Sequence, residues 1–342
     1  MATDAQTLAR LCHARLVSPE ERDMPELPEV ETVRRGLAAQ IVGRTFDRIS
    51  YLEWPRTIAT PEPDALAARL AGRRVAAVRR RAKFLVIDLD GGDHLVVHLR
   101  MTGQLAVAPA IAPRERYARV AFAFTDGDEL RFSDIRRFGR IELHDAAALA
   151  ARFGDLGPEP LGEDWTAEDF VAALAARRTR LKPLLLDQTF LAGLGNIYVD
   201  ESLFRARLHP LTPAAAVPAE QARALHAAIR AILADAVASG GTTFSNYRDA
   251  FGQEGDYYER RQVYDRAGAA CPICGEQIVR IVVGGRGTHL CTHCQPAPTA
   301  PTAPSVDEGT IIAFPVRRAL RAVAEERAAY DADKGREGRD DG

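Results

Sequence analysis

The chain has 342 residues, of which 46% are hydrophobic and 27% are charged, and its formal net charge is −2 at pH 7. These values are typical of folded globular domains and exclude a disordered or collagen-like chain, and no uncharged apolar run approaches the roughly 18 residues of a membrane span. A net charge near zero neither identifies nor excludes a nucleic-acid partner, because only the local distribution of charge decides that.

Residues 1–24 form a leader without the periodicity of a packed element. Its most apolar stretch, LARLCHARLV, is interrupted by Arg10, His13 and Arg15 and therefore lacks the apolar centre of a secretory signal. We expect a cytoplasmic protein, in which the five cysteines do not indicate a disulfide framework, because such bonds are rare in a reducing compartment.

The first regular pattern follows the acidic, proline-rich run RDMPELPEVETVRR. Within it, PEVETVRRGLAAQIVG predicts a helix over residues 28–43, because its aliphatic residues share one face, Pro28 suits the first turn and Gly43 suits the end. From 83 to 145, the alternating runs KFLVIDL, HLVVHL, RVAFAFT, ELRFS and GRIELH, with turns such as DGGD and DG, predict antiparallel hairpins.

The pattern becomes helical from about residue 165 to residue 240. TAED marks the start of one predicted helix, and Pro218 and Gly240 bracket another. A short module rich in glycine and cysteine follows at 256–295, and then the linker PAPTAPTAPS. The remaining tail has only weak helical spacing, so we interpret residues 296–342 as a linker with a disordered or helical appendage.

The cysteine module carries the most specific local signal in the sequence. CPIC and CTHC are two CxxC knuckles separated by sixteen residues, the spacing of a tetrahedral thiolate zinc site, with four reduced structural cysteines as the alternative. Four thiolates complete the coordination shell of a zinc ion, which predicts a structural zinc. His289 and His293 are then not expected to be ligands. The predicted ligands are Cys271, Cys274, Cys291 and Cys294.

Between the knuckles, IVRIVVGGRGTHL predicts a hairpin whose tip presents Arg286 among glycines. Glycines let a backbone approach a phosphate closely while the guanidinium binds it, so Arg286 is a candidate phosphate ligand. A solvated turn arginine is the alternative reading of the same residues.

Several motifs, in one order, give a resemblance to a known family. PELPEVE after a methionine, RRRAKF, HLRMTG, SDIRRFGR, LDQTFLAGLGNIYVDESLF and the final CxxC, GRGTH and CxxCQ are together similar to bacterial formamidopyrimidine-DNA glycosylase, over residues 24–295. The resemblance implies a bifunctional base-excision enzyme that removes oxidised purines, such as 8-oxoguanine and formamidopyrimidines, from double-stranded DNA and cuts the strand at the abasic site. It also implies a monomer with one structural Zn²⁺, located at the nucleoid of a bacterial cytoplasm.

The fold that the resemblance implies is α+β. Residues 1–24 are then a leader, 25–155 an N-terminal β-sandwich catalytic domain flanked by helices, 156–255 a helical helix-two-turn-helix DNA-binding domain, 256–295 a four-cysteine zinc-finger hairpin, and 296–342 the tail.

The resemblance makes Pro25 the nucleophile. A free secondary amine can attack the anomeric carbon of the sugar and become an iminium, which acidifies the neighbouring C–H for elimination. Inside a chain the same nitrogen belongs to an amide, and its lone pair is delocalised into the carbonyl. We therefore expect that translation starts at Met24, or that the leader is cut off, and that Met24 is then removed.

The other catalytic roles implied by the resemblance fall on three charged residues. Glu26 is implied as general acid and base beside the nucleophile, whereas nearby Glu29 equally suits the first turn of a helix, where a carboxylate stabilises the dipole. Lys83 is implied to assist β-elimination and to touch a DNA phosphate, and with Arg79–Arg81 it would form a basic strand entrance; one charge on a solvated edge is the alternative. Arg286 is implied as a helper in δ-elimination.

A glycosylase takes the damaged nucleotide out of the stack, and side chains fill the gap. Met101, Arg136 and Phe138 match the intercalating residues of the family, with Arg136 on the orphaned base. Met101 and Phe138 are core residues by default, but both lie in loop-like sequence, where burial is less expected.

Further DNA contacts are implied at four positions, with unequal support. Tyr117 departs from the histidine that is usual in the family, and His98 equally suits a satisfied strand histidine. Gly193 and Gly195 let helices turn close to the DNA backbone. The implied contacts are Tyr117, Arg177, Asn196 and His98.

Two other functions remain open. An endonuclease VIII-type glycosylase of the same superfamily acts on oxidised pyrimidines, but PELPEV, Met101 and RRF argue against it. A non-catalytic protein that binds DNA lesions is expected if the leader stays attached to Pro25. Lesion preference is assigned to a loop within TTFSNYRDAFGQEGDYYER.

Overall fold

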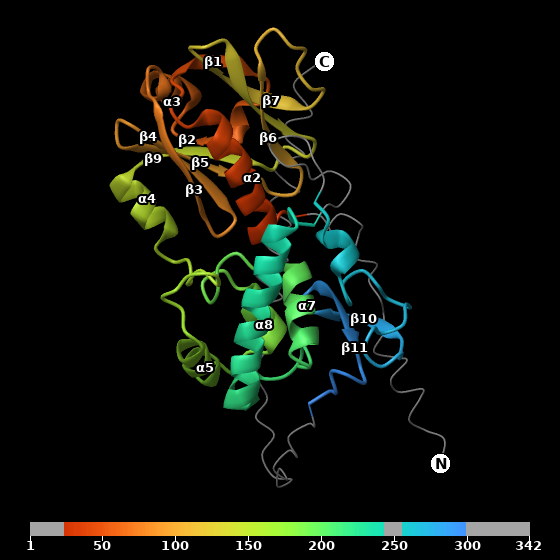
Figure 1. The fold of residues 1–342 in the computed structure, drawn as a ribbon. Coiled ribbons are helices and arrows are strands. Elements are labelled where there is room, and N and C mark those ends of the chain that lie inside the picture. The colour runs from red at the N-terminus through yellow and green to blue at the C-terminus, as the bar shows by residue number, and fades with distance from the viewer. Residues whose placement is uncertain (1–23, 243–254, 299–342) are drawn as a thin grey trace, which may run out of the picture. The chain divides into compact units, whose positions relative to one another are not determined.

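The computed structural model describes residues 24–242 and 255–298 (Figure 1). The leader ahead of Met24, most of the loop assigned to lesion preference and the tail beyond residue 298 lie outside the described residues. Within the described ranges, no helix combines the length and the apolar character that crossing a bilayer demands.

Helix α2, Leu27–Ile41, confirms the predicted N-terminal helix. Glu29 reaches back and accepts the backbone N–H of Glu26, the residue before the helix, at 2.8 Å. Gly43 follows the last turn with φ of +88°, a conformation that glycine adopts without strain. The buried face of α2 consists of Val30, Val33, Leu37 and Ile41. The helix therefore starts at the predicted catalytic residues and fixes them to the hydrophobic core.

Two sheets form the sandwich that the resemblance implied. The first has the order β1 (Phe46–Leu52), β7 (Ala118–Phe124), β8 (Asp128–Asp134) and β6 (Gly103–Pro109). The second has the order β2 (Ile58–Thr60), β9 (Arg140–Asp145), β5 (Asp93–His98), β4 (Phe84–Leu89) and β3 (Val75–Arg81). All neighbouring pairs are antiparallel except β2 with β9. Helices α3 (Pro63–Leu70) and α4 (Ala146–Phe153) and the short η2 (Pro55–Thr57) accompany the sheets.

The main core lies between these sheets and includes the inner faces of α2 and α3. Phe46 stacks on Phe124 at 4.8 Å between ring centroids and meets Phe122 edge-on at 6.1 Å. Burying one such side chain stabilises the fold by about 1.5–3 kcal/mol. A second core is helical and includes Leu27 from the first turn of α2, so the two cores meet at the start of this helix.

The helical part contains α5 (Ala167–Ala175), α6 (Leu181–Leu186), α7 (Asn196–Arg205), η3 (Ala214–Ala216) and α8 (Ala219–Ala238). Thr166 and Asp169 form the capping box that TAED predicted, and Pro218 precedes α8 as expected. Helix α8 packs against α5, α7 and α2, and Figure 1 shows α7 and α8 side by side.

The cysteine module confirms the predicted hairpin. After the short η4 (Tyr257–Arg260), strands β10 (Ile278–Val283) and β11 (Arg286–Cys291) pair antiparallel. Gly284 and Gly285 form the turn with φ of +57° and +78°. Strand β11 packs against α7, which joins the hairpin to the helical part (Figure 1).

A buried ion pair fixes the hairpin to α6 and α7. Lys182 Nζ lies 2.6 Å from Asp200 Oδ1 and donates to the carbonyl of Gly287 at 3.0 Å, while the other carboxylate oxygen accepts the N–H of His289 at 2.8 Å. Neither charged side chain is exposed. Removing one partner of such a pair costs about 3–5 kcal/mol, because the other charge is left buried and uncompensated. The residue next to Gly287 is Arg286, so this pair positions the tip of the hairpin.

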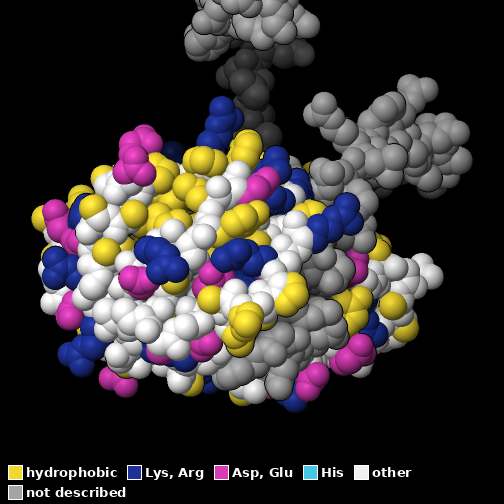
Figure 2. Space-filling view, turned by 90° about the horizontal axis from the view of Figure 1, so that it is seen from above, with side chains coloured by type: hydrophobic (Ala, Val, Ile, Leu, Met, Phe, Trp, Pro, Cys, Tyr) yellow, Lys and Arg dark blue, Asp and Glu magenta, His cyan; other side chains and the backbone are white. Residues whose placement is uncertain are grey.

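Figure 2 shows the face at the top of Figure 1. Lys and Arg side chains are interspersed there with Asp, Glu and apolar side chains and do not gather in one basic patch. The described residues on this face therefore form no continuous basic track for a polyanion.

Candidate active site

A cavity of about 770 Å³ lies where the segment of Met24 and Glu26, the sandwich loops, the helical part and the cysteine hairpin meet. Met24, the residue before Pro25, lines it, and Pro25 itself is buried. The cavity brings together Glu26 and Arg286, which are 260 positions apart in the sequence. The predicted site residues that line it are Glu26, Lys83, His98, Met101, Arg136, Asn196 and Arg286.

Glu26 is held by the N-terminus of helix α7. Its carboxylate accepts the backbone N–H groups of Gly195 at 2.8 Å and Ile197 at 2.9 Å, with Tyr198 N at 3.5 Å. Free N–H groups and the helix dipole make this end of α7 a natural place for an anion. Because Leu27 N also donates to the carbonyl of Gly193 at 3.0 Å, the first turn of α2 is fixed to the loop that starts α7.

The glycines of GLGN are explained by this contact. A Cβ on Gly195 would lie 2.3 Å from Cδ of Glu26, and one on Gly193, whose φ is +93°, would lie 2.7 Å from Leu27. The sequence suggested that these glycines admit a close DNA backbone, whereas in the structure they admit the side chains at the start of α2.

The Gly195→Ala variant is expected to lose at least about tenfold in activity and to unfold at a lower temperature, because the added methyl group displaces the Glu26 carboxylate. Lesion excision and thermal unfolding measure the two effects. Gly154→Ala is the matched control, because Gly154 has an ordinary helical φ of −59° and a Cβ there meets nothing closer than 3.5 Å. Equal behaviour of the two variants would contradict the packing argument.

A second carboxylate lies directly behind Glu26. Glu29 is buried and accepts the hydroxyl of Tyr198 at 2.5 Å and the N–H of Thr242 at 2.7 Å, besides the N–H of Glu26. Burial raises the pKa of both carboxyl groups, and that of Glu26 rises to about 7, with the charge of Lys83 lowering it and that of Glu29 raising it. Glu26 therefore changes its protonation state near neutral pH, as a general acid or base does.

Lys83 lies in the turn between β3 and β4, one residue before the strand that the sequence predicted to include it. Its pKa is lowered by burial and also by Arg286, while Glu26 and Glu29 raise it. Glu159 supports this turn by accepting the N–H of Ala82, whose φ is +52°, at 2.6 Å.

The three arginines before Lys83 do not form the basic strand entrance that the sequence suggested. Arg79 pairs with Asp88, Arg80 with Glu31 and Glu159, and Arg81 also with Glu159. Each guanidinium is thus compensated by a carboxylate. Lys83 faces the cavity without them, which separates it from the solvated-edge alternative.

The intercalating candidates lie in two neighbouring loops. Met101 follows β5, and Arg136 and Phe138 lie between β8 and β9. The Arg136 guanidinium lies over the Phe138 ring at 4.9 Å, and 47% of Phe138 is exposed. An exposed aromatic ring in a loop contradicts the default reading of Phe138 as a core residue.

Asn196 and His98 hold defined positions in the cavity wall. Asn196 Nδ2 donates to the carbonyl of Gly287 at 2.9 Å, which links α7 to the hairpin of Arg286. His98 Nδ1 accepts the N–H of Arg100 at 3.0 Å, and burial lowers the pKa of His98 to about 3. His98 is therefore neutral at physiological pH.

Like Phe138, two further predicted DNA contacts do not line the cavity. Arg177 is exposed beyond helix α5, and Tyr117 is half-buried between Arg116 and Arg119, whose guanidinium carbons lie 5.3 and 5.9 Å from its ring. Both stay predictions.

The cavity also contains side chains that the sequence did not single out. Arg100 and Gln188 belong to quoted motifs, HLRMTG and LDQTF, so their motifs were a usable signal. Tyr264 and Arg152 carried no signal, and Arg152 reaches the cavity from α4 with its guanidinium 4.8 Å from the Phe84 ring centroid.

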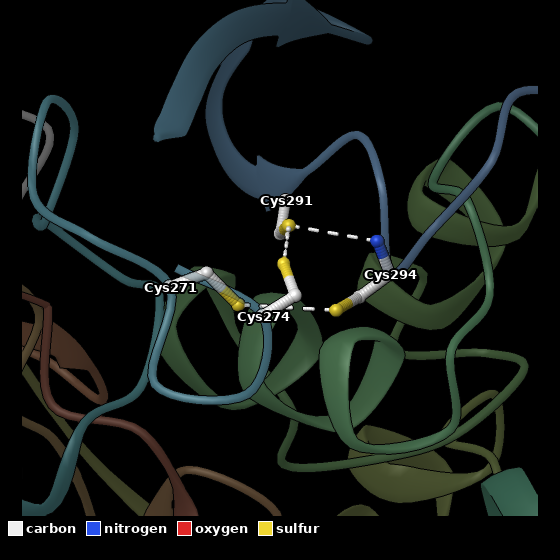
Figure 3. A group of neighbouring side chains, drawn as sticks. All are labelled: Cys271, Cys274, Cys291 and Cys294. Carbon is white, nitrogen blue, oxygen red and sulfur yellow. Dashed lines mark hydrogen bonds between the residues drawn. The ribbon is translucent and has the colours of Figure 1, made fainter. Parts of the chain in front are cut away.

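The four cysteines form a metal site. Their sulfur atoms all lie within 4.8 Å of one another, with 3.8 Å between Cys271 and Cys294 and 3.5 Å between Cys274 and Cys291. A tetrahedral zinc ion with Zn–S bonds of about 2.3 Å separates its sulfurs by about 3.8 Å. Figure 3 shows the sulfurs turned toward one another. The set fits one structural zinc ion, and neither His289 nor His293 belongs to this cluster.

Comparisons with known proteins agree along the whole described chain. Family models match in order: "Formamidopyrimidine-DNA glycosylase N-terminal domain" over residues 24–141, "Formamidopyrimidine-DNA glycosylase H2TH domain" over 156–248, and "Zinc finger found in FPG and IleRS" over 268–297. A formamidopyrimidine-DNA glycosylase of Herpetosiphon aurantiacus is 47% identical over 272 residues, which are 80% of this chain and 100% of that protein. One of Chloroflexus aurantiacus is 48% identical, with 80% and 98% covered.

Solved structures give the same picture. The chain is similar to Lactococcus lactis Fpg (MutM) in complex with DNA containing N7-benzyl-Fapy-dG, with a TM-score of 0.75, 38% identity, and 80% of this chain and 100% of that chain covered. It is equally similar, at a TM-score of 0.75 and 37% identity, with the same shares of the two chains covered, to MutM in complex with DNA containing carbocyclic 8-oxo-G.

Proposed function

Because the chain belongs to the formamidopyrimidine-DNA glycosylase family, we propose that it excises oxidised purines, 8-oxoguanine and formamidopyrimidines, from double-stranded DNA and then cuts the strand at the abasic site. The single observation that carries this proposal is the cavity beside Met24 and Glu26. There Glu26, Lys83 and Arg286 converge from three parts of the chain beside the residue that caps Pro25.

The residues divide the chemistry among them. The uncapped nitrogen of Pro25 attacks the anomeric carbon and displaces the base, and Glu26 transfers the proton that this step needs. Protonation of the sugar ring oxygen then breaks its bond to the anomeric carbon and opens the ring to an iminium. This iminium acidifies the adjacent C–H, so that the two flanking phosphates leave in successive β- and δ-eliminations, assisted by Lys83 and Arg286. Hydrolysis then frees Pro25.

DNA binding uses the other residues of the site. Met101, Arg136 and Phe138 fill the gap left by the flipped nucleotide, and Asn196, Arg286 and His98 hold the flanking backbone. Tyr117 and Arg177 are proposed to contact DNA away from the cavity, since neither residue lines it.

The domain division at 25–155, 156–255 and 256–295, and a cytoplasmic location at the nucleoid, belong to the same proposal. The domain division is supported by the change from sandwich to helices to hairpin along the chain.

The test compares two duplexes that differ only in the lesion. With 8-oxoguanine opposite cytosine we expect base release, a nicked strand and a covalent adduct on borohydride reduction. With an oxidised pyrimidine in the same position we expect at least about tenfold slower release, the discrimination available to a shaped pocket. Faster release of the pyrimidine would favour an endonuclease VIII-type enzyme, and binding without adduct would favour a non-catalytic lesion-binding protein.

A further inference from the structure

The two loops that carry the intercalating residues share one buried carboxylate. Asp134, the last residue of β8, is 1% exposed. Its Oδ1 accepts the hydroxyl of Thr102 and the N–H of Arg136 at 3.1 Å, and its Oδ2 accepts the N–H of Gly139 at 2.7 Å. Thr102 lies directly after Met101, so a single side chain connects the Met101 loop with both ends of the loop of Arg136 and Phe138.

Both loops also rest on one aromatic ring. A Cβ on Gly103 would lie 2.8 Å from Cζ of Phe132, and a Cβ on Gly139 would lie 2.3 Å from the same atom. Phe132 is fully buried in the core. Because Gly103 and Gly139 have no Cβ, both loops can pack directly against the Phe132 ring.

The outer side of the second loop is anchored as well. Arg119 Nε donates to the carbonyl of Asp134 at 2.7 Å, and its Nη1 pairs with Glu53 at 2.7 Å. Arg137, with φ of +60°, pairs with the same Glu53 at 2.7 Å and lies over the ring of Trp54 at 4.5 Å. Arg137, which lies between Arg136 and Phe138 in the sequence, therefore anchors the loop to Glu53 and Trp54.

We propose that Asp134 is a positioning residue that couples the two loops through Thr102, so that Met101, Arg136 and Phe138 enter the DNA as one preformed wedge. The inference rests on the proposed function. Opening the stack costs a few kcal/mol, and loops that had to be ordered at the same moment would add an entropic cost to it. Because the hydrogen bonds to Asp134 already join the two loops without DNA, binding does not incur this additional entropic cost.

A substitution at Thr102 tests the coupling while leaving the Asp134 carboxylate in place. Thr102→Val removes the hydroxyl that donates to Asp134 and accepts the N–H of Arg136 at 3.1 Å, but Asp134 keeps its bonds to Arg136 and Gly139. Thr102→Ser retains the hydroxyl and is the matched control. The wild type and both variants are compared as proteins whose chain begins at Pro25.

For Thr102→Val we expect single-turnover excision of 8-oxoguanine from duplex DNA to slow about five- to tenfold, the effect of losing the hydrogen bonds of one buried hydroxyl. The fluorescence rise of a 2-aminopurine beside the lesion, which reports unstacking, slows by the same factor. Borohydride trapping on single-stranded abasic DNA, where no stack is opened, stays within about twofold of the wild type. Thr102→Ser matches the wild type in all three assays.

Three results would overturn the coupling: wild-type rates for Thr102→Val on the duplex lesion, a proportional loss on single-stranded abasic DNA, or a Thr102→Ser variant as slow as Thr102→Val. If the wild type itself neither excises 8-oxoguanine nor is trapped on DNA, the proposed function fails, and this inference fails with it.

Discussion

The protein whose chain begins at Pro25 is expected to be trapped covalently on 8-oxoguanine or abasic DNA by borohydride, whereas the protein that retains residues 1–24 is expected to give no adduct. An amide nitrogen has no available lone pair, so the leader removes the nucleophile as completely as a substitution does. Loss of a covalent nucleophile lowers turnover by roughly 10³-fold or more.

The structure gives this prediction a second basis. Met24 lines the cavity, so the residue before Pro25 occupies the wall against which the sugar has to bind. N-terminal sequencing of the natively expressed protein identifies the form that cells contain. Gel shifts with the same DNA serve as the control, because both forms retain the residues proposed to bind DNA. Excision at full speed by a chain that truly begins at Met1 would refute the nucleophile assignment.

The Glu26→Gln variant is expected to lose about 10²- to 10⁴-fold in base excision, the contribution of a positioned general acid or base. Burial raises the pKa of Glu26 to about 7, so the protonated form is present below that pH and is lost as the pH rises through it. The wild-type excision rate should therefore fall above about pH 7, and this limb of the profile should be absent in the variant. Strand cutting at a preformed abasic site, where the base has already left, should fall less.

The raised pKa of Glu26 also makes the stability of the folded protein depend on pH. Because the folded state holds the Glu26 proton more tightly than the unfolded state, the associated stabilisation is complete below about pH 4.5 and is lost as the pH rises through about 7. Unfolding of wild type and variant, measured at pH 5 and pH 8, checks this separately from catalysis. A pH–rate profile identical in both proteins would exclude Glu26 as the titrating group.

The sequence predicted the central strands better than the edge strands, for a physical reason. The runs that became β7 and β4 are apolar, and every residue of β7 is buried. Strands β1 and β6 form the two edges of the same sheet, and their sequences, FDRISYL and GQLAVAP, mix polar and apolar residues because one side meets solvent. Alternation is weak in such strands, so neither was predicted.

Within the site, local chemistry could be predicted and long-range contacts could not. The four cysteines show zinc spacing within residues 271–294, and the role of Pro25 was implied by the resemblance of the short motif that contains it. The contact between Glu26 and Gly195 joins positions 169 residues apart, and the pair of Lys182 and Asp200 looks like ordinary helix composition in the sequence. Only the folded chain shows that these residues lie together.

The carboxylate of Glu26 is at once the proposed acid and the joint between α2 and α7. A substitution made to change the pKa at this position therefore also changes the contact between α2 and α7. Any substitute must still accept two backbone N–H groups in a space that tolerates no additional carbon. Evolution faces the same restriction, so that variation in substrate choice is more easily accommodated in the loops around the cavity than at its acid.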